Sequence, residues 1–210
     1  MPEIAVGPEP PAAVEPAARP DDVPGGVAGL ILTGGRSTRM GRDKASLVIG
    51  GMPLARHLAL LLATTTRPAL EVGPGRSGLA TTDPDPGEGP LAAIAAGWRS
   101  LTRLGHDGPV IVIATDLPGL TIGVLAWLAA RPEAVSVVPI VAGSPQSLCA
   151  RWCPADLDRA VELVGAGERA VHRALGPTTA FLGEDAWGSV ASAQAFEDVD
   201  RPEDLAAGAT

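Results

Sequence analysis

The chain has 210 residues, of which 46% are hydrophobic and 19% charged, and its formal net charge is −8. This length suits one compact domain of ordinary size and is too short for two large ones. No apolar run reaches the ~18 residues of a transmembrane helix, and the opening MPEIAVGPEP lacks the features of a secretory signal. Nucleic-acid binding needs clustered Lys and Arg, which an acidic chain does not favour. We therefore expect a cytoplasmic protein that binds neither a membrane nor nucleic acid.

Residues 1–26 differ from the rest of the chain in composition. They hold 7 of the 21 prolines, carry half of the net charge and contain no aromatic residue. Such a segment cannot bury enough apolar surface to offset the entropy lost on ordering. We predict a disordered leader over 1–26 and a single domain over 27–210.

Strands and helices are expected to alternate after residue 26. Apolar, β-branched runs bounded by turn residues predict strands, at Val27–Thr33, Ala69–Val72, Pro109–Thr115, Ala134–Val141 and Phe196–Val199. A further strand, Ser147–Trp152, is expected to pair with 134–141 across a turn at 143–145. Apolar residues at helical spacing predict helices, at Pro53–Ala63, Pro90–Leu104, Thr121–Ala130, 154–165, 167–175 and 202–207. This alternation indicates an α/β fold with a mainly parallel sheet covered on both faces.

A glycine-rich loop follows the first expected strand, where ligands of such sheets bind. Four cations and one acid between residues 36 and 44 give it a local charge of +3 in an acidic chain. Its glycines let backbone N–H groups approach an anion, and Lys44 is the one lysine among the 16 basic residues. The loop fits a polyphosphate cradle, although neither GxxxxGK[ST] nor GxGxxG is present. An ordinary surface turn is the alternative.

Other chemistry-bearing residues are few. Asp116 closes the clearest apolar strand, where a carboxylate can hold Mg²⁺ together with phosphate oxygens; a simple turn aspartate is the alternative. The two cysteines, Cys149 and Cys153, exclude a disulfide framework, and their spacing fits no common zinc site. Cys149 is expected to be a small core residue.

Several segments together resemble the molybdenum cofactor guanylyltransferase family, a branch of the nucleotidyltransferases. The matching segments run along nearly the whole chain after residue 26: LTGGRSTRMGRDKASL at 32–47, GPLAAI at 89–94, ATDLPGL at 114–120, PQSLCARW at 145–152 and FEDVDRPEDL at 196–205. The resemblance implies a three-layer, Rossmann-like nucleotidyltransferase fold. It also implies transfer of GMP from GTP to molybdopterin with Mg²⁺, and molybdoenzymes or cofactor-delivery proteins as further partners.

Nucleotidyl transfer brings an anionic phosphate to an anionic triphosphate, so the protein must supply donors, cations and a metal. Gly34 and Gly35 would offer N–H groups to the triphosphate. Arg39 would neutralise its β- and γ-phosphates, and Lys44 would reach the α-phosphate. As the resemblance implies, Leu32 and Thr33 would lie against the base and ribose.

The resemblance also implies two further carboxylates. Asp85 would accept hydrogen bonds from guanine, with Asp83 and Glu88 as alternatives. Asp200 would complete the metal site at Asp116, with Asp198 and Glu197 as rivals. One departure weakens the case for guanine: where members of the family often carry Asn after the second strand, this chain has Gly73 at the nearest position and no Asn anywhere.

Three functions remain open from the sequence. The first is the guanylyltransferase reaction. The second is a relative that uses CTP, or that transfers to another phosphorylated acceptor such as a sugar phosphate. The third is a non-catalytic nucleotide-binding module, against which the presence of Arg39, Lys44 and Asp116 argues.

Overall fold

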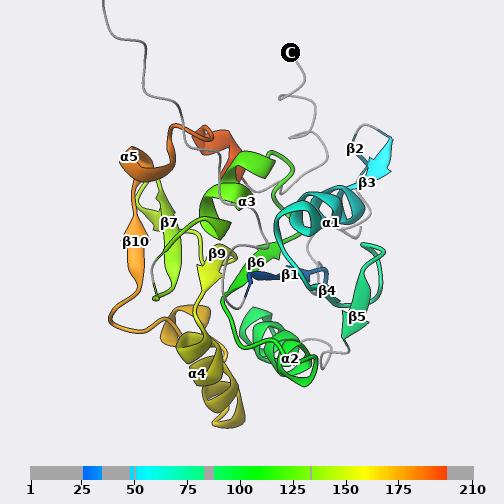
Figure 1. Cartoon of the computed structure of the whole chain (residues 1–210), viewed down its shortest axis with the longest axis vertical. Coiled ribbons are helices and arrows are strands. Elements are labelled where there is room, and N and C mark those ends of the chain that lie inside the picture. The colour runs from blue at the N-terminus through cyan, green and yellow to red at the C-terminus, as the bar shows by residue number, and fades with distance from the viewer. Residues whose placement is uncertain (1–25, 35–47, 50, 83–87, 133, 198–210) are drawn as a thin grey trace, which may run out of the picture.

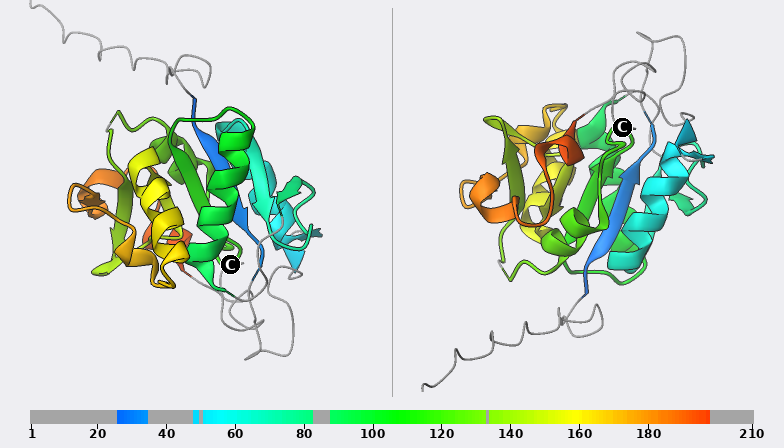
Figure 2. Two further views of the ribbon diagram at one scale, coloured as in Figure 1. Left: turned by 90° about the horizontal axis from the view of Figure 1, so that it is seen from below. Right: turned by 90° about the horizontal axis from the view of Figure 1, so that it is seen from above.

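The fold is known from a computed structural model, which describes residues 26–34, 48–49, 51–82, 88–132 and 134–197. A central sheet is covered on both faces by helices, in three layers (Figure 1). Figure 2 shows the same layers from two further sides. The expected α/β class, with a mainly parallel mixed sheet between helices, is confirmed. Among the described residues, no helix is long and apolar enough to cross a membrane.

The main sheet has the strand order β10-β7-β9-β6-β1-β4-β5. Its strands are β1 (Ala28–Leu32), β4 (Ala69–Val72), β5 (Ala80–Thr82), β6 (Val110–Ala114), β7 (Val137–Val141), β9 (Cys149–Trp152) and β10 (Ala180–Leu182). All neighbours in this order are parallel except β9, which runs antiparallel to both β6 and β7. The carboxyl ends of β1, β4 and β6 therefore lie side by side at one edge of the sheet.

Two short strand pairs complete the β structure. β8 (Ser144–Pro145) pairs with β7 across a tight turn in which Ala142 and Gly143 both have positive φ. β2 (Val48–Ile49) pairs with β3 (Met52–Pro53).

The helices bury one apolar stripe each. α1 (Leu54–Thr65) and α3 (Ile122–Ala129) cover one face of the sheet, and α2 (Pro90–Arg103) and α4 (Pro154–Gly165) cover the other (Figure 1). The hydrophobic core has one cluster on each face of the sheet, and the side chains of β1 point alternately into the two. Ile31 packs with α1 and α3, and Leu30 packs with α2 and α4. A parallel strand covered on both faces is apolar at every position, as β1 is.

Gly29 on β1 marks the tightest contact between the sheet and α1. A Cβ at this position would lie 2.7 Å from Leu62 Cγ and closer still to Thr66 Oγ1. We expect Gly29→Ala to lower the free energy of unfolding by about 1–3 kcal/mol, because overpacking forces neighbours to move. Gly165→Ala is the matched control: a Cβ there meets nothing within 4 Å, and alanine favours the helix. Urea unfolding of both variants checks this; equal stabilities would contradict the tight packing at Gly29.

Most of the expected elements are present. The strand expected at Ala69–Val72 is confirmed with the same bounds, and the helices expected at 90–104, 121–130 and 154–165 are confirmed within a residue or two. The helix expected from Pro53 begins one residue later, with Pro53 as its N-cap. The 147–152 segment pairs with β7 only at Val137↔Arg151, and its main partner is β6.

Two expectations about the last third of the chain are wrong. The segment 167–175 forms only the short 3₁₀ helix η3 (Val171–Arg173), because the Glu168 carboxylate accepts the amides of Arg169 and Ala170 and turns the chain. Phe196 does not begin a strand but ends the 3₁₀ helix η4 (Ala193–Phe196), where it packs edge-on against Trp187. Trp187 ends the short helix α5 (Glu184–Trp187). The expected helix at 202–207 and residues 1–25 of the expected leader lie outside the described residues.

Candidate nucleotide site at the carboxyl edge of the sheet

Three parallel strands place their carboxyl ends together. Leu32 on β1 is in register with Ala114 on β6 and Val72 on β4, so the residues that follow each of them meet at one edge. Hydrogen bonds tie these ends to each other: Thr33 N donates to Val72 O at 3.1 Å, and Thr115 Oγ1 donates to Leu32 O at 3.3 Å. In open α/β sheets this is the edge at which ligands bind.

Thr33 and Gly34 begin the expected phosphate loop at this edge. The side chains of Leu32 and Thr33 are buried, so a ligand above the edge would meet their backbone rather than their side chains. Gly34 is exposed. The rest of the loop, including Gly35, Arg39 and Lys44, lies outside the described residues, as do Asp83, Asp85, Asp198 and Asp200.

Gly73 lies against the start of this loop. It has a φ of +151°, and a Cβ on it would lie 2.8 Å from Gly34 N and closer still to Thr33 Oγ1. Glycine is therefore required here by both conformation and close approach. The position identified from the sequence as the nearest to the family's Asn thus borders the site, with no room for a side chain in this packing.

Glu71 is the one acidic residue on β4 and is fully buried. Its Oε1 accepts from Thr33 Oγ1 and from the amides of Gly75 and Arg76, both at 2.8 Å. Its Oε2 accepts from Ser77 N at 2.7 Å and from Ser77 Oγ at 2.6 Å. One carboxylate therefore joins the end of β1 to the segment that follows β4.

These donors determine the charge state of Glu71. Burial acts to raise the pKa of its carboxyl, but the hydrogen bonds from Ser77, Thr33 and the amides of Arg76 and Ser77 outweigh burial and hold the pKa below its ordinary value of 4.5. Each of these donors satisfies the ionised form, which accepts and does not donate. Glu71 is therefore a carboxylate at neutral pH.

Because the folded-state pKa of Glu71 is lowered, its stabilisation is present above the ordinary pKa and is lost as pH falls through the folded value. We expect wild type to be more stable than Glu71→Gln at pH 7, with the difference shrinking towards acid. Thermal unfolding of both proteins at a series of pH values measures this. A stability difference that is the same at every pH would contradict it.

Asp116 stands at the end of β6, two residues beyond Ala114, and is half-buried. Buried side chains of Leu117 and Leu120 anchor the turn that follows it. Cys149, in register with Ile113 at the start of β9, is buried as expected, and burial together with the charge of Asp116 raises the pKa of its thiol to about 12. The Asp116 carboxylate therefore lies at the ligand-binding edge of the sheet, where its oxygens suit Mg²⁺.

No group of three or more His, Cys, Asp or Glu side chains within the described ranges could hold a metal on its own. Mg²⁺ sites in proteins commonly use one or two carboxylates and complete the shell of the ion with phosphates and water. Of the alternatives named from the sequence, Glu197 is exposed just after η4. Glu88 is engaged elsewhere, since its carboxylate lies 3.3 Å from the Arg169 guanidinium.

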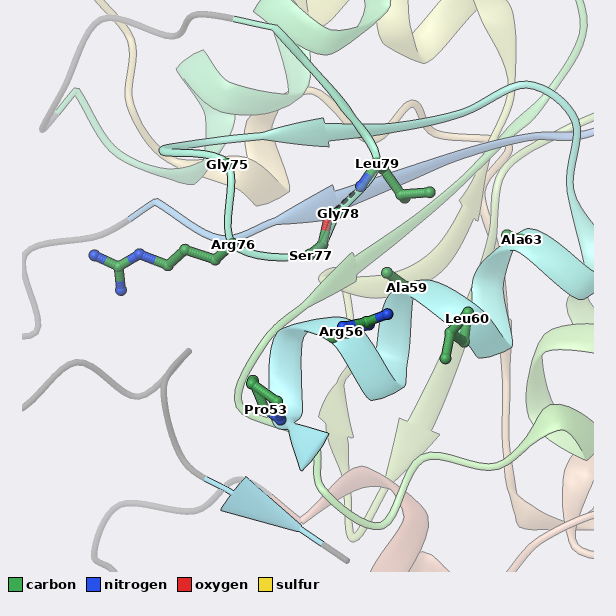
Figure 3. Close-up of a pocket in the computed structure, with 10 residues that line it drawn as sticks. All are labelled: Pro53, Arg56, Ala59, Leu60, Ala63, Gly75, Arg76, Ser77, Gly78 and Leu79. Carbon is green, nitrogen blue, oxygen red and sulfur yellow. Dashed lines mark hydrogen bonds between the residues drawn. The ribbon is translucent and has the colours of Figure 1, made fainter. Parts of the chain in front are cut away.

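A pocket of about 500 Å³ lies between one side of α1 and the segment that follows β4. Figure 3 shows Arg56 on the helical wall and Arg76 on the loop wall, and none of the described residues that line the pocket is acidic. Ser77, whose hydroxyl also accepts from Leu79 N at 3.2 Å, shapes the loop wall. The segment held by Glu71 thus forms one side of this pocket.

Residues 29–179 match the MobA-like NTP transferase domain family. The chain belongs to this family. "Probable molybdenum cofactor guanylyltransferase" of Mycobacterium tuberculosis is 37% identical over 161 residues, covering 71% of this chain and 78% of that protein. "Molybdenum cofactor guanylyltransferase" of Rhodobacter capsulatus is 33% identical over 187 residues, covering 86% and 93%.

A solved structure shares the fold of this MobA-like protein. Molybdopterin-guanine dinucleotide biosynthesis protein A of Archaeoglobus fulgidus superposes with a TM-score of 0.66 at 20% identity, covering 86% of this chain and 95% of that one. The resemblance identified in the sequence is confirmed, and the protein is a nucleotidyltransferase of the NTP transferase family. Sequence analysis did not single out Glu71; the signal was an acid within an otherwise apolar strand.

Proposed function

We propose that this protein transfers GMP from GTP to molybdopterin of the molybdenum cofactor and releases pyrophosphate. The observation that carries the proposal is the position of Asp116 and of the Gly34 loop start at the ends of adjacent strands β6 and β1, in a chain whose curated relatives are named molybdenum cofactor guanylyltransferases. Strand ends so arranged suit a triphosphate with its metal on one side and the loop on the other.

The reaction needs little proton chemistry. The second pKa of a phosphate monoester is about 6, so the acceptor phosphate of molybdopterin is largely ionised at neutral pH. One of its oxygens attacks the α-phosphorus of GTP, a new P–O bond forms, and the bond to the β-phosphate bridging oxygen breaks. Pyrophosphate leaves with the electron pair, so no residue has to act as a general base.

The protein must stabilise the negative charge of the triphosphate and of the departing pyrophosphate. Amides of Gly34 and Gly35 would donate to the triphosphate, Arg39 would neutralise the departing pyrophosphate, and Lys44 would stabilise charge at the α-phosphate. Asp116 would hold Mg²⁺, which neutralises phosphate oxygens when bound. Leu32 and Thr33 would line the nucleoside through their backbone.

Fewer residues of the chain bear on the selection of the base than on the binding of the phosphates. Asp85 would accept from the guanine ring N–H and amino group, a pattern that cytosine and adenine do not offer. Glu88, the rival nearest to α2, already pairs with Arg169. A CTP-using relative, an enzyme with another phosphorylated acceptor and a non-catalytic nucleotide-binding module remain the alternatives.

A pyrophosphate-release assay with purified molybdenum cofactor, Mg²⁺ and each triphosphate tests the proposal. We expect release with GTP, and transfer of label from α-labelled GTP to molybdopterin. Equal or faster transfer from CTP would favour the cytidylyltransferase alternative. Binding of GTP and Mg²⁺ without pyrophosphate release from any phosphorylated acceptor would favour the non-catalytic module.

A further inference from the structure

Glu71 holds together two segments that are far apart in the sequence. Thr33 precedes it by 38 residues and begins the phosphate loop, while Gly75, Arg76 and Ser77 follow it by four to six residues. Among the described residues, all of its hydrogen bonds go to these two segments and not to α1 or α3, which cover its face of the sheet. The carboxylate thus acts on the ligand-binding edge and not on the packing of helices.

Gly73 makes the arrangement interlocking. Its backbone packs against the Thr33 hydroxyl and Gly34 N, a close approach that is possible because Gly73 carries no side chain, and the same Thr33 hydroxyl donates to Glu71. Movement of the 73–77 segment would therefore move the first amide of the phosphate loop. Glu71 is thus linked through Thr33 and the segment after β4 to Gly34 N, the first amide of the expected phosphate loop.

We propose that Glu71 is a positioning residue for the nucleotide: its carboxylate fixes the 73–77 segment against Thr33, and so aims the start of the phosphate loop at the triphosphate. This inference rests on the proposed function for the identity of the ligand. It assigns Glu71 to nucleotide affinity, not to the chemical step, because an amide aimed in advance contributes to ground state and transition state alike.

A second buried carboxylate, Asp156, provides a control that distinguishes an effect on nucleotide binding from an effect on stability alone. Asp156, at the start of α4, accepts from Ser136 Oγ at 2.6 Å and from Gly176 N at 3.0 Å. Ser136 directly precedes β7, which runs in the same direction as β6, so this cluster lies at the opposite edge of the sheet from Asp116. Removing a hydrogen bond at Asp156 should cost stability without altering the nucleotide site.

The test compares Glu71→Gln with Ser136→Ala as the control. Glutamine keeps the shape of Glu71 but replaces one of the two carboxylate oxygens with an NH₂ group, which donates and does not accept. Two of the donors that face Glu71 then lack an acceptor. Calorimetric titration with Mg²⁺-GTP gives Kd, steady-state assays give KM and kcat, and thermal unfolding gives Tm. We expect Glu71→Gln to raise Kd and KM for GTP about tenfold, with kcat changed less than about threefold. Ser136→Ala should lower Tm and leave Kd unchanged.

Ser77→Ala keeps the test decisive if Glu71→Gln does not fold. It removes one of the five donors and leaves the carboxylate in place, so we expect a weaker increase in the Kd for GTP, about threefold. The inference is overturned if variants at Glu71 and Ser77 bind GTP as tightly as Ser136→Ala does. A wild-type protein that binds GTP but releases no pyrophosphate would instead contradict the proposed transfer, and the binding comparison would still report on Glu71.

Discussion

Lys44→Ala is expected to lower kcat by about 10²–10³, the loss typical of one preorganised contact to developing charge. Lys44 is the one lysine in a chain whose other basic residues are all arginine, and the proposed function places it at the α-phosphate. Its replacement should leave Tm unchanged, because a loop cation at a ligand site contributes to binding and catalysis more than to folding. Rates of pyrophosphate release at saturating GTP, together with thermal unfolding, measure both effects.

Arg103→Ala is the matched control for Lys44→Ala. Arg103 is an exposed cation in the last turn of α2, which leads the chain back towards the start of β6 and away from the ligand edge. The Arg103→Ala substitution removes one positive charge without changing the expected site, so kcat should stay at the wild-type value. Near-wild-type turnover in Lys44→Ala would remove Lys44 from the mechanism.

Asp116→Asn is expected to lower kcat by about 10² or more and to raise the Mg²⁺ concentration needed for half-maximal rate. The amide keeps the shape of the side chain but supplies only a neutral oxygen to a cation that prefers carboxylates. Titration of the rate with Mg²⁺ at fixed GTP measures both changes. The variant should fold, since Asp116 is half-buried and its turn is anchored by Leu117 and Leu120.

Asp107→Asn provides the control at the other end of the same strand. Asp107 is exposed and precedes β6, so it lies at the opposite edge of the sheet from Asp116. Its neutralisation removes the same charge from the protein and should change neither kcat nor the Mg²⁺ dependence. If both variants respond to Mg²⁺ as wild type does, Asp116 does not hold the metal.

The sequence was most informative where a segment is buried on both faces. β1, β4 and β6 are short apolar runs closed by glycine or acid, and each forms a strand at or close to its expected bounds. The edge strands were missed for the opposite reason. β5 is Ala-Thr-Thr and mostly exposed, and β10 exposes Phe181, so neither has an apolar pattern that distinguishes a strand from a loop.

The residues of the candidate site were likewise only partly predictable from the sequence. Asp116 was singled out because it closes a clearly apolar strand, and in the structure it follows β6, the strand adjacent to β1, which Gly34 follows. The role of Glu71 could not be read from the sequence. An acid in an apolar strand signals a constraint, but its partners include a threonine in another strand and amides of a turn, which only the fold brings together.

The reversed course of β9 separates the two flanks of this edge. Between β6 and β7 the edge is continued by the first residue of a strand, Cys149, and then by the Ala142–Gly143 turn that follows β7. Hydrogen bonds join the tips of β1, β4 and β6 to one another, and Ala114 N at the tip of β6 also donates to Leu148 O, just before β9. β9 and β6 stand between the Ala142–Gly143 turn and β1, so we expect substitutions in this turn to alter the far flank of the edge more than the Gly34 end.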